Sequence, residues 1–192
     1  MEELKELMIF CNPNKSRYLD LSRFEDRKYL YSYYSDRLSG NTSLPPIERV
    51  LREKIPKGVL VDVGAGPHSY SNVFSLAIDF GAKAYIGFDL GFKKLRVVDD
   101  FDPKGFLVPE DMLVGISKVN VNSANFSFNG IDWLTRDYGE AIVDELERAT
   151  IDEGIIFGVG SEGVQLLINH RKSFRKLNLE GYYHDWFIYQ KN

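Results

Sequence analysis

Short apolar runs recur along the chain from residue 59 onward, and turn residues separate each run from the next. The runs at residues 59–63, 84–88 and 154–159 do not alternate strictly between apolar and polar positions, which is typical of strands buried on both faces of a sheet. The pattern predicts five strands, at residues 59–63, 84–88, 105–108, 124–128 and 154–159.

Between these runs, apolar residues recur at helical spacing. One stripe runs from Tyr70 to Ile78 and is followed by Gly81, a residue type that commonly ends helices. Asp137 and Glu140 resemble a capping box before another stripe. Strands that alternate with helices predict a doubly wound α/β fold, with a mostly parallel sheet covered on both faces. The further helices are expected at residues 110–119, 137–149 and 163–177.

The two ends of the chain differ from this alternating part. Residues 1–45 are polar and rich in tyrosine, and we expect them to form a helical extension that could act as a lid. Residues 46–192 then form the α/β domain. After the helix at 163–177, little room is left for a two-stranded hairpin, which favours a sheet trimmed at its C-terminal end. Residues 182–189 are nevertheless aromatic enough for a last strand or a tight hairpin.

Charge and cysteine content narrow the classes of protein that fit. The formal net charge of −4 over 192 residues argues against a protein that mainly grips nucleic-acid phosphates. The single cysteine, Cys11, excludes an internal disulfide and fits a reducing compartment. The acidic N-terminus lacks the cationic start of a secretory signal, and no apolar run approaches the roughly 20 residues that span a bilayer. We therefore expect a cytoplasmic protein without a membrane partner.

Two glycines follow the first predicted strand directly, in the segment Val63-Gly64-Ala65-Gly66. A strand that runs into Gly-x-Gly and then into a helix brings bare backbone beside a ligand. The second strand ends at Asp89, 25 residues after Gly64. With the two strands side by side, Asp89 lies next to the glycine loop, where a carboxylate can accept hydrogen bonds from both hydroxyls of a ribose.

Dinucleotides and S-adenosylmethionine are the two cofactor classes that use such a loop. A dinucleotide binder needs a third glycine at position 69 to bring a helix N-terminus onto the pyrophosphate, but the residue there is Ser69. Asp62, two residues before Gly64, is a poor neighbour for a pyrophosphate and a good one for a cationic amino-acid moiety. The charge pattern therefore favours S-adenosylmethionine, which carries a sulfonium and an ammonium group.

These segments also resemble a known family. Residues 59–66 are similar to motif I of the class I (Rossmann-like) S-adenosylmethionine-dependent methyltransferases, and residues 85–90 to its second strand with the ribose-binding acid. Residues 106–111, 122–130 and 153–159 resemble its third to fifth strands, mainly by their order. The resemblance covers residues 46–190 and implies a Rossmann-like fold and methyl transfer from S-adenosylmethionine.

The resemblance also implies roles for individual residues. Asp62 would meet the amino end of the cofactor, Asp89 its ribose and Asp111 the exocyclic amine of adenine. The implied cofactor contacts are Asp62, Gly64, Ala65, Gly66, His68, Asp89, Leu90, Asp111 and Asn129. A universal catalytic residue is not expected, because the methyl group is already activated and the protein mainly has to align the reactants. The candidates for a catalytic role are Asn129, Asp132 and His68, and those for substrate contact are Tyr33, Tyr34 and Trp133.

Each assignment has a plain structural alternative. The glycines could simply form a turn, Asp89 and Asp111 could cap helices, and the N-terminal tyrosines could pack against the domain. His68 stands where the family usually has a third glycine. This departure motivates a second hypothesis, a catalytically inactive methyltransferase-like binding protein, and an NAD(P)-dependent oxidoreductase is the third.

Two missing motifs bear on the class of methyl acceptor and on metal binding. The fourth strand does not carry the Asn/Asp-Pro-Pro-aromatic tetrad that accompanies methylation of amino groups on bases or glutamine. With the acidic net charge, this favours a small molecule or a protein as acceptor. No His, Cys and carboxylate residues have the spacing of metal ligands, so we expect no metal.

Overall fold

The computed structural model describes residues 57–66, 70–129, 138–160, 162–177 and 186–192. The strands are β1 (Val59–Val63), β2 (Ala84–Phe88), β3 (Arg96–Val98), β4 (Gly105–Val108), β5 (Ala124–Asn129), β6 (Ile155–Val159), β7 (Phe174–Lys176) and β8 (Trp186–Lys191). The helices are α4 (Tyr70–Phe80), α5 (Met112–Lys118), α7 (Ala141–Ala149) and α8 (Glu162–Asn169). The five predicted strands and the four predicted helices are thus confirmed, with shifted ends. The helical extension expected at residues 1–45 lies outside the described residues.

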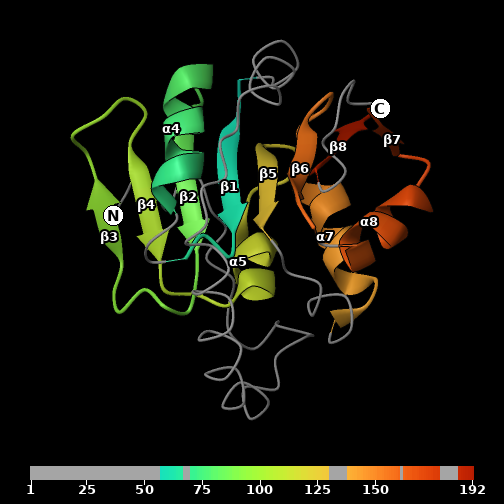
Figure 1. Cartoon of the computed structure of the whole chain (residues 1–192), viewed down its shortest axis with the longest axis horizontal. Coiled ribbons are helices and arrows are strands. Elements are labelled where there is room, and N and C mark those ends of the chain that lie inside the picture. Colours follow the sequence, from blue (N-terminus) through green and yellow to red (C-terminus); the bar gives the residue numbers. More distant parts are fainter. Residues whose placement is uncertain (1–56, 67–69, 130–137, 161, 178–185) are drawn as a thin grey trace.

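One eight-stranded sheet, in the order β3-β4-β2-β1-β5-β6-β8-β7, crosses the molecule (Figure 1). β4, β2, β1, β5 and β6 are parallel, whereas β3 and β8 pair antiparallel with their neighbours. Strand order reverses at β1, which lies between β2 and β5, and ligands of such sheets bind beyond the carboxyl ends of the strands at this point. The doubly wound, mostly parallel α/β fold is confirmed.

Helices cover both faces of the sheet, as the apolar strands require. α4 packs on one face with Leu60 and Tyr85, and α5, α7 and α8 pack on the other face with Val61 and Phe126. All five residues of β1 are buried, and so are all five of β2. The sheet is therefore the middle layer of three. None of the helices in the described ranges is long and apolar enough to cross a membrane.

The expected trimming of the C-terminal hairpin is wrong. β7 and β8 pair antiparallel, from Phe174 opposite Lys191 to Lys176 opposite Tyr189, and β8 joins the sheet beside β6. The hairpin has room because the preceding helix, expected to reach Leu177, ends at Asn169. Phe174 and Leu177 continue the helical spacing in the sequence, but pairing with β8 takes this segment into the sheet.

The end of α4 and the start of α7 can be compared with the helix ends that the sequence predicted. Gly81 ends α4 with φ +63°, Ala82 N–H donates to the Ala77 carbonyl at 2.9 Å, and Gly81 N–H donates to that of Ile78 at 3.1 Å. This is the glycine-ended helix that the sequence predicted. By contrast, α7 begins after Glu140, whose side chain makes no capping hydrogen bond, and Asp137 lies outside the described residues.

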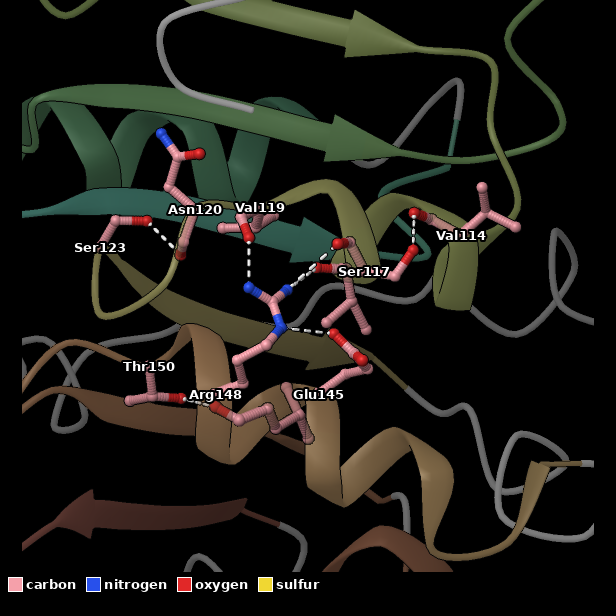
Figure 2. A network of polar contacts seen from close by, with 10 residues as sticks. Val114, Ser117, Val119, Asn120, Ser123, Glu145, Arg148 and Thr150 are labelled. Atoms are coloured by element: carbon pink, nitrogen blue, oxygen red, sulfur yellow. Dashed lines mark hydrogen bonds and ion pairs between the residues drawn. The ribbon is translucent and has the colours of Figure 1, made fainter. Parts of the chain in front are cut away.

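At the end where the parallel strands begin, Arg148 of α7 joins two helices (Figure 2). Its guanidinium donates to the carbonyls of Val119 (2.8 Å), Ile116 (3.1 Å) and Ser117 (3.2 Å), at the C-terminal end of α5. Its Nε also donates to Glu145 at 2.7 Å. The last carbonyls of a helix have no partner within the helix, so this cation satisfies them and complements the helix dipole.

Candidate functional site

The loop after β1 has the backbone that only glycine adopts readily. Gly64 and Gly66 have φ of +75° and +70°. The N–H groups of Gly64 and Ala65 both donate to the Phe88 carbonyl, at 3.0 and 3.2 Å, and Tyr70 N–H donates to the Gly66 carbonyl at 3.3 Å. The loop is therefore tied to the end of β2 on one side and to the start of α4 on the other. The predicted strand, glycine turn and helix are present in this order.

Asp89, the acid after β2, holds this loop in place. Its Oδ2 accepts from Gly66 N–H at 2.9 Å and its Oδ1 accepts from Gly91 N–H at 2.7 Å. Burial raises the pKa of Asp89, and the hydrogen bonds from Gly91 and Gly66 oppose this shift. Each carboxylate oxygen can accept a second hydrogen bond, so ribose hydroxyls can still be bound. The sequence predicted where Asp89 lies but not that it clamps the loop.

Asp62 is a buried carboxylate with one oxygen that has no hydrogen-bond partner among the described residues. It lies in β1, is 1 % exposed, and its Oδ2 accepts a hydrogen bond from the Tyr85 hydroxyl at 2.8 Å. Its Oδ1 is buried without any hydrogen-bond partner. Burial raises the pKa of Asp62 to about 7, although the side chains of Tyr85 and, to a lesser extent, Ser127 act in the opposite direction. An unpartnered buried carboxylate oxygen is costly, and such groups call for a functional explanation.

These residues fit a ligand that has a cationic end and a sugar. The unpartnered Oδ1 of Asp62 would be satisfied by an ammonium donor, and the carboxylate would then keep its charge at neutral pH. Gly64 and Gly66, the two glycines with positive φ, have no Cβ, so a ligand can approach the backbone of the loop closely. Asp89 provides the acceptors that vicinal hydroxyls need. The cofactor contacts of Asp62, Asp89 and the glycine loop stay predictions.

Asp111, expected either to cap a helix or to contact adenine, does cap one. It is 3 % exposed, and its Oδ1 accepts from the N–H groups of Leu113 (3.1 Å) and Val114 (3.4 Å) at the start of α5. Leu90 directly follows Asp89 and is 43 % exposed. Asn129 is the last residue of β5 at the same edge of the sheet. Contacts of these three residues with a cofactor stay predictions.

The remaining candidates lie outside the described residues: His68, Asp132, Trp133, Tyr33 and Tyr34. Their assignments stay predictions. Within the described residues, no group of three or more His, Cys, Asp or Glu side chains could hold a metal ion.

Several solved structures that are similar to this one carry methyltransferase names. A methyltransferase from Geobacter sulfurreducens is similar over 99 % of this chain and 93 % of its own, with a TM-score of 0.57 and 12 % identity. A candidate rRNA methylase from Clostridium thermocellum is similar over 79 % of this chain and 96 % of its own, with a TM-score of 0.55 and 12 % identity. The candidate methyltransferase yhhF of Escherichia coli matches 76 % and 83 % of the two chains, with a TM-score of 0.51 and 11 % identity.

At these identities the likeness concerns the fold. No family model and no curated protein sequence matches the chain. The structure thus has the class I methyltransferase fold, with β4, β2, β1, β5 and β6 parallel and the β7–β8 hairpin at one end of the sheet. The site at the carboxyl edge of these strands is the place where such α/β sheets bind ligands.

Proposed function

We propose that this protein is an enzyme that transfers a methyl group from S-adenosylmethionine, bound at the carboxyl edge of β1 and β2. The observation that carries the proposal is the buried Oδ1 of Asp62, which has no partner and lies two residues before the glycine loop. A cationic amino-acid moiety would explain it, and the methyltransferase fold supports this assignment. A dinucleotide would bring phosphates next to the same carboxylate, which is unfavourable.

The residues would hold the cofactor along its length. Asp62 would receive the ammonium, directly or through water, and Gly64 to Gly66 would shape the loop under the methionine moiety. Asp89 would bind the ribose hydroxyls while it keeps its hydrogen bonds to Gly66 and Gly91. Leu90, which is exposed, would flank the adenine. Asp111 keeps α5 capped, and an interaction with the exocyclic amine would use its remaining acceptor capacity.

The bound cofactor supplies a methyl group that its sulfonium already activates. The chain then has to align the acceptor with that methyl and to exclude water, which is the kind of catalysis that positioning supplies. A general base would be required only for an acceptor that loses a proton on methylation. Asn129, Asp132 and His68 are the candidates to orient or deprotonate such an acceptor.

The acidic net charge of −4 and the missing tetrad after β5 favour a small molecule or a protein as acceptor. The candidate rRNA methylase with the same fold means that the fold does not exclude RNA. A screen for acceptors should therefore include RNA along with protein extracts and metabolite fractions.

Calorimetric titration with S-adenosylmethionine and S-adenosylhomocysteine tests the proposal. Micromolar binding is expected, and Asp89→Ala should abolish it because this substitution removes the ribose acceptor and the loop clamp together. Asp152→Ala removes a carboxylate at the opposite edge, 72 % exposed in its side chain, and should leave binding unchanged. If the wild-type protein binds neither ligand, the protein is a methyltransferase-like binding protein. If NAD binds instead, it is an oxidoreductase.

A further inference from the structure

Tyr85 reaches Asp62 from the neighbouring strand by an unusual route. In the register of β1 and β2, Tyr85 lies beside Leu60, whereas Asp62 lies beside Gly87. The Tyr85 hydroxyl therefore extends along the sheet toward the carboxyl edge, past Gly87, to donate to Asp62 Oδ2 at 2.8 Å. Tyr85 is fully buried, so water does not compete for this hydrogen bond.

Gly87 leaves the space that this route requires. A Cβ at Gly87 would lie 3.0 Å from the Tyr85 hydroxyl and 3.0 Å from the Cβ of Ala65 in the glycine loop. Both contacts are tighter than ordinary van der Waals packing. On the side of α4, the Phe74 ring packs against the Tyr85 ring at a tilt of 39°, with 5.0 Å between centroids. The tyrosine ring is thus fixed by Phe74 and its hydroxyl passes over a glycine.

The hydrogen bond from Tyr85 makes the two carboxylate oxygens of Asp62 different from each other, because only Oδ2 accepts it. Tyr85 has one proton to donate, and the Tyr70 carbonyl, its other neighbour, is 3.5 Å from the hydroxyl and so the poorer acceptor. The proton therefore goes to Oδ2 of Asp62. Oδ1 has no partner in the described residues. One oxygen is fixed by the protein and the other is left for a ligand.

We propose that Tyr85 is a positioning residue, which anchors Oδ2 of Asp62 so that Oδ1 stays available for the ammonium group of the cofactor. This inference rests on the proposed function and adds a residue to the site. Tyr85 does not touch the ligand and acts through Asp62. The other titratable group near the pair is Tyr70, from α4. Ser127 of β5 lies beside Asp62 in register, and its hydroxyl also lowers the pKa of Asp62.

Removal of the hydroxyl should weaken the ammonium contact in two ways. In Tyr85→Phe the carboxylate loses the donor that fixes its orientation. The ionised form of Asp62 also loses a stabilising hydrogen bond, so the pKa of Asp62 rises further and a smaller fraction of the group is ionised at pH 7.5. A neutral carboxyl group does not attract an ammonium ion. Phenylalanine keeps the ring that packs on Phe74.

The test compares two ligands that differ only in the ammonium group: S-adenosylhomocysteine and its deaminated analogue. Calorimetry at pH 7.5 gives both dissociation constants. Wild-type protein should prefer S-adenosylhomocysteine by about tenfold or more, the range of one charge-assisted hydrogen bond. Tyr85→Phe should lose this preference while its affinity for the deaminated analogue stays near that of the wild type. A general defect in folding would weaken both ligands alike.

Two variants make the test specific. Tyr189→Phe, on β8, also removes the hydroxyl of a buried tyrosine, which donates to Asn169 of α8 at 2.8 Å, and it should keep the wild-type preference. Asp62→Asn should lose the preference, and adding Tyr85→Phe to it should change the preference no further.

Three results would overturn the inference. Tyr85→Phe could keep the wild-type preference, it could weaken both ligands equally, or it could lower the preference further in the Asp62→Asn background. A wild-type protein that binds neither ligand would instead refute the proposed function, and with it the role of Tyr85.

Discussion

Polar side chains at the two ends of the parallel strands differ in their hydrogen bonding; we call these ends the amino edge and the carboxyl edge of the sheet. At the edge where the parallel strands begin, polar side chains are paired within the protein: Arg148 bonds three carbonyls of the α5 end, Asn125 accepts from Ile155 N–H at 3.0 Å, and Gln190 donates to the Glu153 carbonyl at 3.0 Å. At the edge where they end, a buried carboxylate oxygen of Asp62 has no partner. In the described residues, the other buried side-chain group without a partner is the Ser173 hydroxyl, which precedes β7 at the end where the parallel strands begin and carries no charge.

This difference separates stability from binding. Paired polar groups stabilise the packing of α5 and α7 against the sheet, whereas the unpaired oxygen of Asp62 costs stability in the free protein. A residue that costs stability is retained where function requires it, and the same positions often gain stability when they are replaced. Substitutions at the carboxyl edge should therefore change binding, and substitutions at the amino edge should change stability alone.

The largest effect is expected from Asp62→Asn. The pKa of Asp62 is about 7 in the folded protein and about 3.9 in an unfolded chain, so the folded state binds more protons between these values. The stability of the wild type should fall as the pH rises from about 4 to about 7. Asp62→Asn removes this loss and should raise the free energy of unfolding by about 2–4 kcal/mol at pH 8, while ligand preference is lost.

Urea unfolding at several pH values measures this effect. The gain in stability from Asp62→Asn should shrink toward pH 4, where Asp62 is protonated in the folded protein and about half protonated when unfolded. Asp152→Asn, at an exposed carboxylate, is the matched control substitution. If Asp62→Asn destabilised the protein at pH 8, the carboxylate would be stabilising rather than costly, and the contrast between the edges would be wrong.

Arg148→Met should give the next largest effect, with opposite consequences. It leaves three carbonyls of α5 without their donor and Glu145 without its ion pair, which should cost about 2 kcal/mol of stability. Affinity for S-adenosylhomocysteine should not change. Urea unfolding and calorimetry measure the two quantities, and a large loss of affinity would show that the amino edge also serves the site.

Gly66→Ala and Gly81→Ala form a matched pair with smaller effects. Both glycines have positive φ, +70° and +63°, so each substitution should cost about 1–2 kcal/mol of stability. Gly81 ends α4, and nothing lies within 4 Å of an added Cβ there. Gly66→Ala alone should weaken S-adenosylhomocysteine binding, which calorimetry would detect. Equal affinities in the two variants would place the ligand away from the loop.

The smallest effect is expected on the outer surface of α7. Arg171 pairs with Asp144 at 2.7 Å and with Glu140 at 3.4 Å, and it lies 3.8 Å from Glu147. The side chains of Asp144 and Glu140 are largely exposed, and that of Glu147 is 38 % exposed. Such surface ion pairs contribute less than about 1 kcal/mol. Arg171→Ala should therefore leave both stability and binding close to wild type. A loss of 2 kcal/mol or more in urea unfolding would contradict this interpretation.

The sequence predicted the centre of the fold because its local signals agree with the tertiary structure. β1, β2 and β6 are buried on both faces, as their continuous apolar runs predicted. Gly81 ended α4 where the stripe of apolar residues ended. The positions of Gly64, Gly66 and Asp89 were predicted for the same reason, because they follow from the strand ends, which were correctly placed.

Features that depend on pairing across the chain were missed. β3 (Arg96–Val98) is short and largely exposed and carries no periodicity, so only its pairing with β4 defines it. β7 continued the helical spacing of α8 and was included in that helix. The contact between Tyr85 and Asp62 joins residues 23 positions apart and requires the register of β1 and β2. A lone tyrosine in an otherwise apolar strand, two residues before Gly87, was the one available signal.

The most direct test is a crystal structure of the protein with S-adenosylhomocysteine. The account predicts the ligand at the carboxyl edge of β1 and β2, with its ammonium within hydrogen-bond distance of Asp62 Oδ1 and its ribose hydroxyls at Asp89. The Tyr85 hydroxyl should remain on Oδ2. A ligand bound elsewhere, or bound here with Asp62 Oδ1 still unpartnered, would contradict the account.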